Sequence, residues 1–155
     1  MFPELGFWQP CRDADLRALA IVVRHYPEAL KRRRHGQRGG RGFCGPAEKM
    51  VLLGPNCDAL WVWLRPSLVR LDGQTGVACT VFRNESSELS SVLVREADTL
   101  ADQRWPGLRH WTYVDPVATA RRRGRSSPPG RCFVEAGWTL LEQTSTRGLR
   151  ILERC

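Results

Sequence analysis

Residues 76–114 read GVACTVFRNESSELSSVLVREADTLADQRWPGLRHWTYV and combine a strand, a helix and a second strand. The apolar run over residues 76–83 predicts the first strand. A helix over residues 88–104 is indicated by i, i+3 and i+4 spacing of Leu89, Val92, Leu93, Ala97, Leu100 and Ala101. Ser86 or Ser87 can cap this helix, and Pro106-Gly107 ends it. Residues 109–114 predict the second strand, which makes the unit a strand–helix–strand crossover.

The flanking segments extend this crossover into a larger sheet. A first helix, capped by Asp13 or Asp15, is expected to reach Arg24. Strands over 49–53 and 59–65 form a hairpin, a short helix spans 132–136, and strands over 138–143 and 149–153 close the chain. Residues 27–46 and 117–131 are expected to be loops. The predicted class is α/β, a mixed sheet with helices on both faces in a single domain over residues 1–155.

Length and composition exclude several classes of protein. A chain of 155 residues is about one domain, and 42% apolar with 26% charged residues excludes general disorder. No apolar run is long enough to span a membrane, and residues 1–10 do not resemble a secretion signal. The 6 cysteines form no CxxC pair, so we expect a reduced, cytoplasmic protein. His25, His35 and His110 lack metal-ligand spacing, and no metal site is expected.

The positive charge is concentrated in two stretches of the chain. Lys and Arg number 24 against 16 Asp and Glu, a net charge of +8. The acid-free stretches contain Lys31, Arg32, Arg33, Arg34, Arg38 and Arg41, and then Arg121, Arg122, Arg123, Arg125 and Arg131. Clustered arginines suit a phosphate backbone, because each neutralised phosphate releases counterions. We therefore predict nucleic-acid contacts at Arg32, Arg33, Arg34, Arg122, Arg123 and Arg125. The alternative is high-GC codon usage, which explains arginine over lysine but not the clustering.

Candidate site residues follow the two strands of the crossover. Ligands in mixed α/β sheets bind beyond the carboxyl ends of parallel strands, here after Arg83 and Val114. Ser90 and Ser91 begin the helix after the first strand, where backbone N–H groups can hold an anion; alternatively they are ordinary helix-start residues. Tyr113 and Asp115 lie on one side of the second strand, where they can act as acid, base or orienting group. The alternative for Asp115 is a turn-forming role before Pro116.

Three motifs resemble a known family. Tyr113-Val114-Asp115-Pro116, followed by PGRCFVEAGW at 129–138, resembles the C-terminal half of the phage Mom family. Members of that family are similar to GCN5-related N-acetyltransferases (the GNAT fold) and modify DNA bases. The segments Arg83-Asn84 with Ser91-Val92-Leu93, and His25-Tyr26, resemble earlier parts of the same family. The expected order of helices and strands is also similar to the GNAT order.

The resemblance implies a fold, a site and a reaction. The fold would be a GNAT-like, mostly antiparallel sheet flanked by helices on both faces. Its implied catalytic residues are Ser91, Tyr113, Asp115, His25 and Tyr26, and its implied cofactor-binding residues are Arg83, Asn84, Ser90 and Phe133. The reaction would transfer a small acyl or carbamoylmethyl-type group to the exocyclic amine of adenine in phage or prophage DNA, an anti-restriction modification. Because a paired base is inaccessible, the target would be flipped out of double-stranded DNA and stacked on Trp111 or Tyr113.

Two departures from the GNAT pattern bear on the donor. The pyrophosphate loop, Gln/Arg-x-x-Gly-x-Gly/Ala, should follow Arg83, yet residues 85–91 contain no glycine. Phe133 also stands where GNAT enzymes often have a tyrosine that acts as a general acid, and a phenyl ring cannot donate a proton. The donor is therefore left open between acetyl-CoA and another acyl donor. Two alternatives are kept: an acetyl-CoA-dependent N-acetyltransferase for a protein or small molecule, and a non-catalytic nucleic-acid-binding module.

Overall fold

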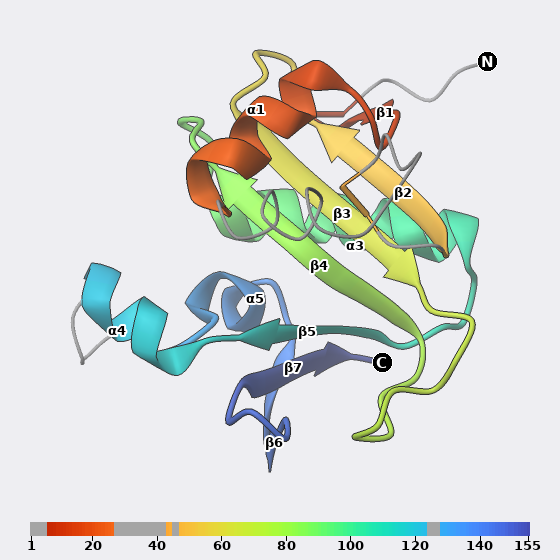
Figure 1. Cartoon of the computed structure of the whole chain (residues 1–155), viewed down its shortest axis with the longest axis vertical. Helices are drawn as coiled ribbons and strands as arrows, with labels where there is room; N and C mark the ends of the chain where they lie inside the picture. The colour runs from red at the N-terminus through yellow and green to blue at the C-terminus, as the bar shows by residue number, and fades with distance from the viewer. Residues whose placement is uncertain (1–5, 27–42, 45–46, 124–127) are drawn as a thin grey trace, which may run out of the picture.

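The computed structural model of the chain describes residues 6–26, 43–44, 47–123 and 128–155, with the backbone alone over 120–123. These residues form a seven-stranded sheet in the order β1-β2-β3-β4-β5-β7-β6 (Figure 1). The strands are β1 (Gln9–Cys11), β2 (Glu48–Leu53), β3 (Ala59–Arg65), β4 (Val77–Asn84), β5 (His110–Val114), β6 (Thr139–Thr144) and β7 (Arg150–Arg154). The helices are α1 (Leu16–His25), α3 (Ser90–Arg104), α4 (Pro116–Arg123) and α5 (Arg131–Glu135). The predicted α/β class is confirmed.

One pair of neighbouring strands runs parallel, and the other pairs are antiparallel. β4 and β5 are joined by α3, and their parallel register pairs Val77 with His110 and Cys79 with Thr112. Gly76 allows β4 to begin close to the start of β5. Its φ is +102°, and a Cβ there would lie 2.2 Å from the Arg109 carbonyl oxygen. The Val77 N–H donates to that same carbonyl at 2.8 Å. The sheet is therefore mixed and mostly antiparallel.

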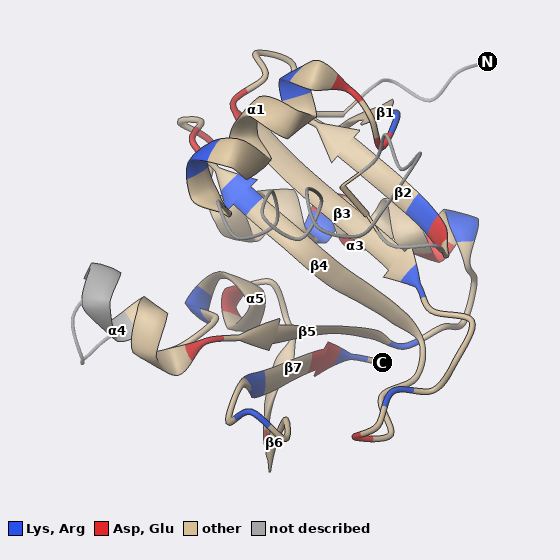
Figure 2. Cartoon of the chain, in the orientation of Figure 1, with Lys and Arg blue, Asp and Glu red and all other residues tan. Residues whose placement is uncertain are grey.

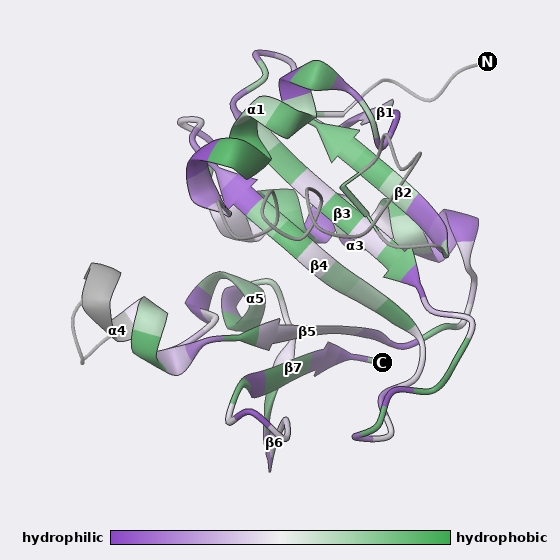
Figure 3. Cartoon of the chain, viewed as in Figure 1, coloured by the Kyte–Doolittle hydropathy of each residue, from purple (hydrophilic) through white to green (hydrophobic). Residues whose placement is uncertain are grey.

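Alternate residues of the same strands enter two separate apolar clusters. Leu52 and Trp61 pack with residues of α3, whereas Val51 and Val62 pack with residues of α1. Successive strand residues point to opposite sides of a sheet, which separates the two clusters. Figure 1 shows α1 in front of the sheet and α3 behind it. The apolar character of β2, β3 and α1 that makes this packing favourable is visible in Figure 3.

The predicted limits of α1 are nearly correct, and those of α3 need correction. Asp15 caps α1, because its carboxylate accepts from the Arg17 N–H at 2.9 Å. α3 is capped by neither predicted serine; its N-cap is Leu89, without a side-chain bond. The Ser86 hydroxyl instead donates to Asn84 Oδ1 at 2.6 Å within the preceding loop. Leu89 is consequently 71% exposed and does not belong to the buried face of the helix.

Two elements were not predicted from the sequence. β1 has only three residues, including Pro10, and pairs antiparallel with β2. α4 occupies the first part of the expected loop over 117–131. Its start is explained by Asp115 as cap and by Pro116, whose fixed φ suits the first helical position. No helix in the described part of the chain has the length and apolar character needed to cross a membrane.

Candidate functional site

A cavity opens where β4 and β5 move apart, at the place where the sequence predicts a ligand. The parallel pairing ends at Cys79 and Thr112, where the Thr112 hydroxyl donates to the Cys79 carbonyl at 2.8 Å. Beyond this pair lies a cavity of about 830 Å³, bounded by residues of α1, β4, α3, β5, α4 and α5. Its volume falls in the range of small-molecule sites.

Most of the side chains predicted for a site meet in this cavity. Its lining includes His25, Tyr26, Arg83, Asn84, Ser90, Tyr113, Asp115 and Phe133. Ser91 does not belong to the lining, because successive helical residues point about 100° apart. Trp111 is 2% exposed and packs edge-on against Tyr113 at 4.9 Å between ring centroids. Stacking of a flipped base on Trp111 was therefore a wrong prediction.

Charged side chains from α1 and β4 form one rim of the cavity. The Arg83 guanidinium lies over the Tyr26 ring at 4.9 Å. His25 Nε2 and Glu85 Oε1 are 2.6 Å apart, and Arg24 donates to both oxygens of the same carboxylate. The hydrogen bonds from Arg24 and then His25 hold the pKa of Glu85 below its usual value. Figure 2 shows basic and acidic residues together at the end of α1, the tip of β4 and α5.

Asn84 shapes the loop that leads from β4 into α3. Its Oδ1 accepts from the Ser86 N–H at 2.9 Å, and its Nδ2 donates to the Glu88 carbonyl at 2.8 Å and to Ser90 Oγ at 3.0 Å. These bonds give hydrogen-bond partners to both the oxygen and the nitrogen of the side-chain amide. Asn84 therefore holds the loop between β4 and α3, which contains no glycine over residues 85–91.

Tyr113 presents its ring in the cavity wall and its hydroxyl to Asp72. The hydroxyl donates to Asp72 Oδ2, and Arg70 lies 5.3 Å from the centre of the ring. Burial raises the pKa of Tyr113, and the hydrogen bond to Asp72 raises it further. The phenol therefore remains protonated at neutral pH and is a poor base. A hydrogen bond from Arg70 acts in the opposite direction on this pKa, but its effect is smaller.

Asp115 marks the boundary between β5 and α4. Its Oδ1 accepts from the backbone N–H groups of Val117 at 2.9 Å and Ala118 at 3.1 Å. This geometry matches the structural alternative considered for Asp115, extended from a turn to a helix cap. The carboxylate also lies in the cavity lining and is exposed, so it can meet a ligand from the same position.

α5 and the apolar core beneath it close the inner end of the cavity. Phe133 is 6% exposed and contacts Trp138 at 4.9 Å between ring centroids. Gly130, which precedes α5, has φ +71°, and a Cβ there would lie 2.7 Å from the Leu152 side chain. Glycine therefore lets α5 lie directly against β7. Phe133 has no hydroxyl, and its position makes it a wall of the cavity.

The predicted nucleic-acid contacts lie mostly beyond what the structure describes. Arg32, Arg33, Arg34 and Arg125 fall outside the described residues, as does nearly all of the loop over 27–46. The backbones of Arg122 and Arg123 belong to the last turn of α4, which follows the cavity residue Asp115. The described residues thus connect one of the two arginine stretches to the cavity through a single helix.

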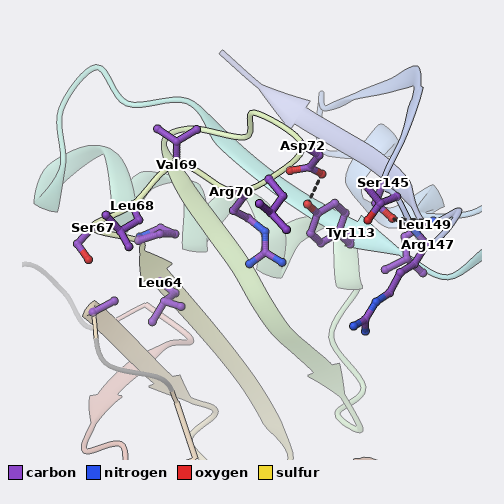
Figure 4. Close-up of a pocket in the computed structure, with 14 residues that line it drawn as sticks. Leu64, Ser67, Leu68, Val69, Arg70, Asp72, Tyr113, Ser145, Arg147 and Leu149 are labelled. Carbon is purple, nitrogen blue, oxygen red and sulfur yellow. Dashed lines mark hydrogen bonds between the residues drawn. The ribbon is translucent and has the colours of Figure 1, made fainter.

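A second cavity of about 660 Å³ shares Tyr113 and Leu149 with the first. Figure 4 shows the Tyr113–Asp72 hydrogen bond in its wall, with Arg70 beside it and Arg147 toward the β6–β7 turn. Leu68 is 81% exposed and Val69 is 67% exposed on its outer loop. Sequence reasoning missed this cavity, since none of its loop residues forms a recognisable motif.

A buried polar network behind the sheet was also missed. Asp98 of α3 is 3% exposed; its Oδ1 is 2.7 Å from His110 Nδ1, and its Oδ2 accepts from Trp138 Nε1 at 2.8 Å. Arg154 pairs with Asp102, one turn further along α3, at 2.9 Å. The network ties α3 to β5, β7 and the segment before β6. The available signal was Asp98 itself, a carboxylate on the apolar face between Val94 and Ala101.

No group of three or more His, Cys, Asp or Glu side chains able to hold a metal ion occurs within the ranges that the structure describes. Searches against protein-family models, curated proteins and solved structures gave no match to this chain.

Proposed function

We propose that this chain is a GNAT-like, Mom-like transferase that modifies a DNA base, with adenine as the target. The observation that carries the proposal is the cavity at the divergence of β4 and β5. Side chains selected from a resemblance in sequence come together there from several separate elements. The mostly antiparallel sheet, with α1 in front of it and α3 behind it in Figure 1, supports the GNAT-like fold that the resemblance implies.

The chemistry of the cavity suits attack by an exocyclic amine on a small donor. Asp115 is exposed in the cavity lining, and its carboxylate can accept a hydrogen bond from the amine and orient it, beside the ring of Tyr113. Arg83 offers positive charge at the rim for an anionic group of the donor. Ser90 brings the first turn of α3 to the same wall, and a helix N-terminus favours negative charge.

The partner in this proposal is double-stranded DNA with the target base flipped into the cavity. Unpairing one base costs a few kcal/mol, which contacts to the backbone phosphates can offset. The arginines at 121–123 follow the cavity on α4, and the basic stretch from Lys31 follows His25 and Tyr26 in the chain. The donor is acetyl-CoA or another acyl-type donor.

The test is mass spectrometry of nucleosides from the DNA of bacteria expressing the chain. We expect a new modified deoxynucleoside, and Asp115→Asn should reduce its amount about 100-fold by removing the carboxylate, while the asparagine side-chain oxygen can still cap α4. Asp102→Asn is the matched control, because this carboxylate lies outside the cavity lining. Unchanged nucleosides with folded wild-type protein would refute the proposal. Tight binding of acetyl-CoA in that case would favour an ordinary acetyltransferase, and DNA binding alone a binding module.

A further inference from the structure

We propose that Glu85 is a positioning residue that fixes the His25 imidazole with its hydrogen on Nε2, leaving Nδ1 to accept a proton from the attacking amine. The inference rests on the proposed function. Sequence reasoning assigns no role to Glu85, although it follows the first candidate strand directly. It lies directly after β4, while His25 is the last residue of α1, and both side chains line the cavity.

The hydrogen-bond geometry decides which ring nitrogen carries the hydrogen. Glu85 Oε1 lies 2.6 Å from His25 Nε2, and Arg24 donates to Oε1 at 3.1 Å and to Oε2 at 2.9 Å. A carboxylate paired in this way is ionised at neutral pH and only accepts hydrogen bonds. Nε2 must therefore donate. A neutral imidazole has one N–H, so the lone pair that can take a proton is on Nδ1.

The surroundings hold Glu85 in place before any ligand binds. Its backbone N–H donates to the Asp58 carbonyl at 2.7 Å, which ties the residue to the turn between β2 and β3. The side chains of His25 and Glu85 are 29% and 33% exposed. Partial exclusion of water strengthens such a contact relative to one at the surface. A carboxylate held beside an imidazole stabilises the imidazolium that forms when Nδ1 takes a proton.

In the transfer step, the amine nitrogen forms a bond to the donor carbon. The bond between that carbon and its leaving group breaks, and the leaving group keeps the electron pair. The N–H bond of the amine breaks, its electrons remain on nitrogen, and the proton goes to His25 Nδ1. The product is a neutral substituted amine beside an imidazolium paired with Glu85.

A structural alternative is that Glu85 only clamps α1 to β4 through Arg24. Two variants separate these roles. Glu85→Gln removes the charge that selects the Nε2–H form, because a neutral amide can either accept from or donate to Nε2. Arg24→Gln removes the clamp but keeps the His25–Glu85 contact. Glu48→Gln is the matched control, since Glu48 also joins strand and helix by accepting from Arg104 at 3.1 Å, outside the cavity lining.

The experiment measures imidazole ¹⁵N chemical shifts of the full chain by NMR, together with base modification. We expect neutral His25 to be in the Nε2–H form in the wild type, in Arg24→Gln and in Glu48→Gln, and in a mixture in Glu85→Gln. Modification should fall at least about tenfold in Glu85→Gln, bounded by the roughly 10²–10⁴-fold effect of losing the base itself.

An Nδ1–H form in the wild type would overturn the inference even if the variant failed to fold. An unchanged His25 signature in folded Glu85→Gln would also overturn it, as would full modification by that variant. The NMR signals do not depend on activity. Modification without the Nε2–H form would therefore refute the role of Glu85 and leave the proposed function standing. The Nε2–H form without any modification would refute the proposed function, and with it the catalytic use of this arrangement.

Discussion

Replacing Asp98 by alanine should destabilise the protein more than any surface substitution on α3. The change leaves two buried N–H groups without an acceptor, His110 Nδ1 and Trp138 Nε1, which now lie 2.7 and 2.8 Å from the carboxylate oxygens. His110 is 0% exposed and Trp138 is 3% exposed, so water cannot readily replace the lost acceptor. Each unsatisfied buried donor costs about 1–3 kcal/mol.

The expected loss for Asp98→Ala is about 3–5 kcal/mol, within the range for leaving two buried donors without an acceptor. For a domain of this size that loss lowers Tm by roughly 6–20 °C. Asp102→Asn is the matched control on the same helix. Its carboxylate is 43% exposed and pairs with Arg154, so the expected loss is below about 1 kcal/mol.

Urea unfolding followed by tryptophan fluorescence measures both variants, with circular dichroism to check the folded state. A loss below about 1 kcal/mol for Asp98→Ala, equal to that of the control, would refute the reasoning. Such a result would mean that His110 and Trp138 find other partners or are solvated without cost.

Two further predictions test local features of the fold. Gly130→Ala should lower the free energy of unfolding by about 1–3 kcal/mol in urea. Gly107 has a similar φ of +76°, but nothing lies within 4 Å of a Cβ built there. Gly107→Ala should therefore lose only the part of this free energy that is due to backbone conformation. Burial raises the pKa of Cys11 to about 11, so at pH 8 roughly one thiol in a thousand is ionised. Iodoacetamide should therefore label the exposed Cys155 well before Cys11, with labelling of Cys11 accelerating as pH rises; equal rates at pH 8 would contradict this.

Most of the regular structure could be predicted because its signals are local. Trp61 and Trp63 lie in an apolar β-rich run and are fully buried, and Leu93, Ala97 and Ala101 form the buried face of α3. These patterns follow the period of one strand or one helix, and tertiary packing does not change them.

The errors occurred where a short polar segment had two possible structures. Asp115-Pro116 can form a turn or begin a helix, and the hydrogen bonds from the Val117 and Ala118 N–H groups to Asp115 Oδ1 favour α4. Ser86 can cap a helix, but Asn84 competes for its hydroxyl and moves the start of α3 to Ser90. Residues that meet only in the folded chain were also missed. Glu85 and Asp98 owe their surroundings to partners on other elements.

The three-residue parallel pairing between β4 and β5 has a mechanical consequence. On either side of it the strands form longer antiparallel ladders, with β2 and β3 on one side and β5 and β7 on the other. When force is applied across the sheet between β3 and β7, the β4–β5 pairing is the shortest ladder under load and has the fewest hydrogen bonds. Rupture should begin at this seam and leave two antiparallel halves tethered by α3. The strands that diverge to form the cavity are thus also the strands that should separate first under force.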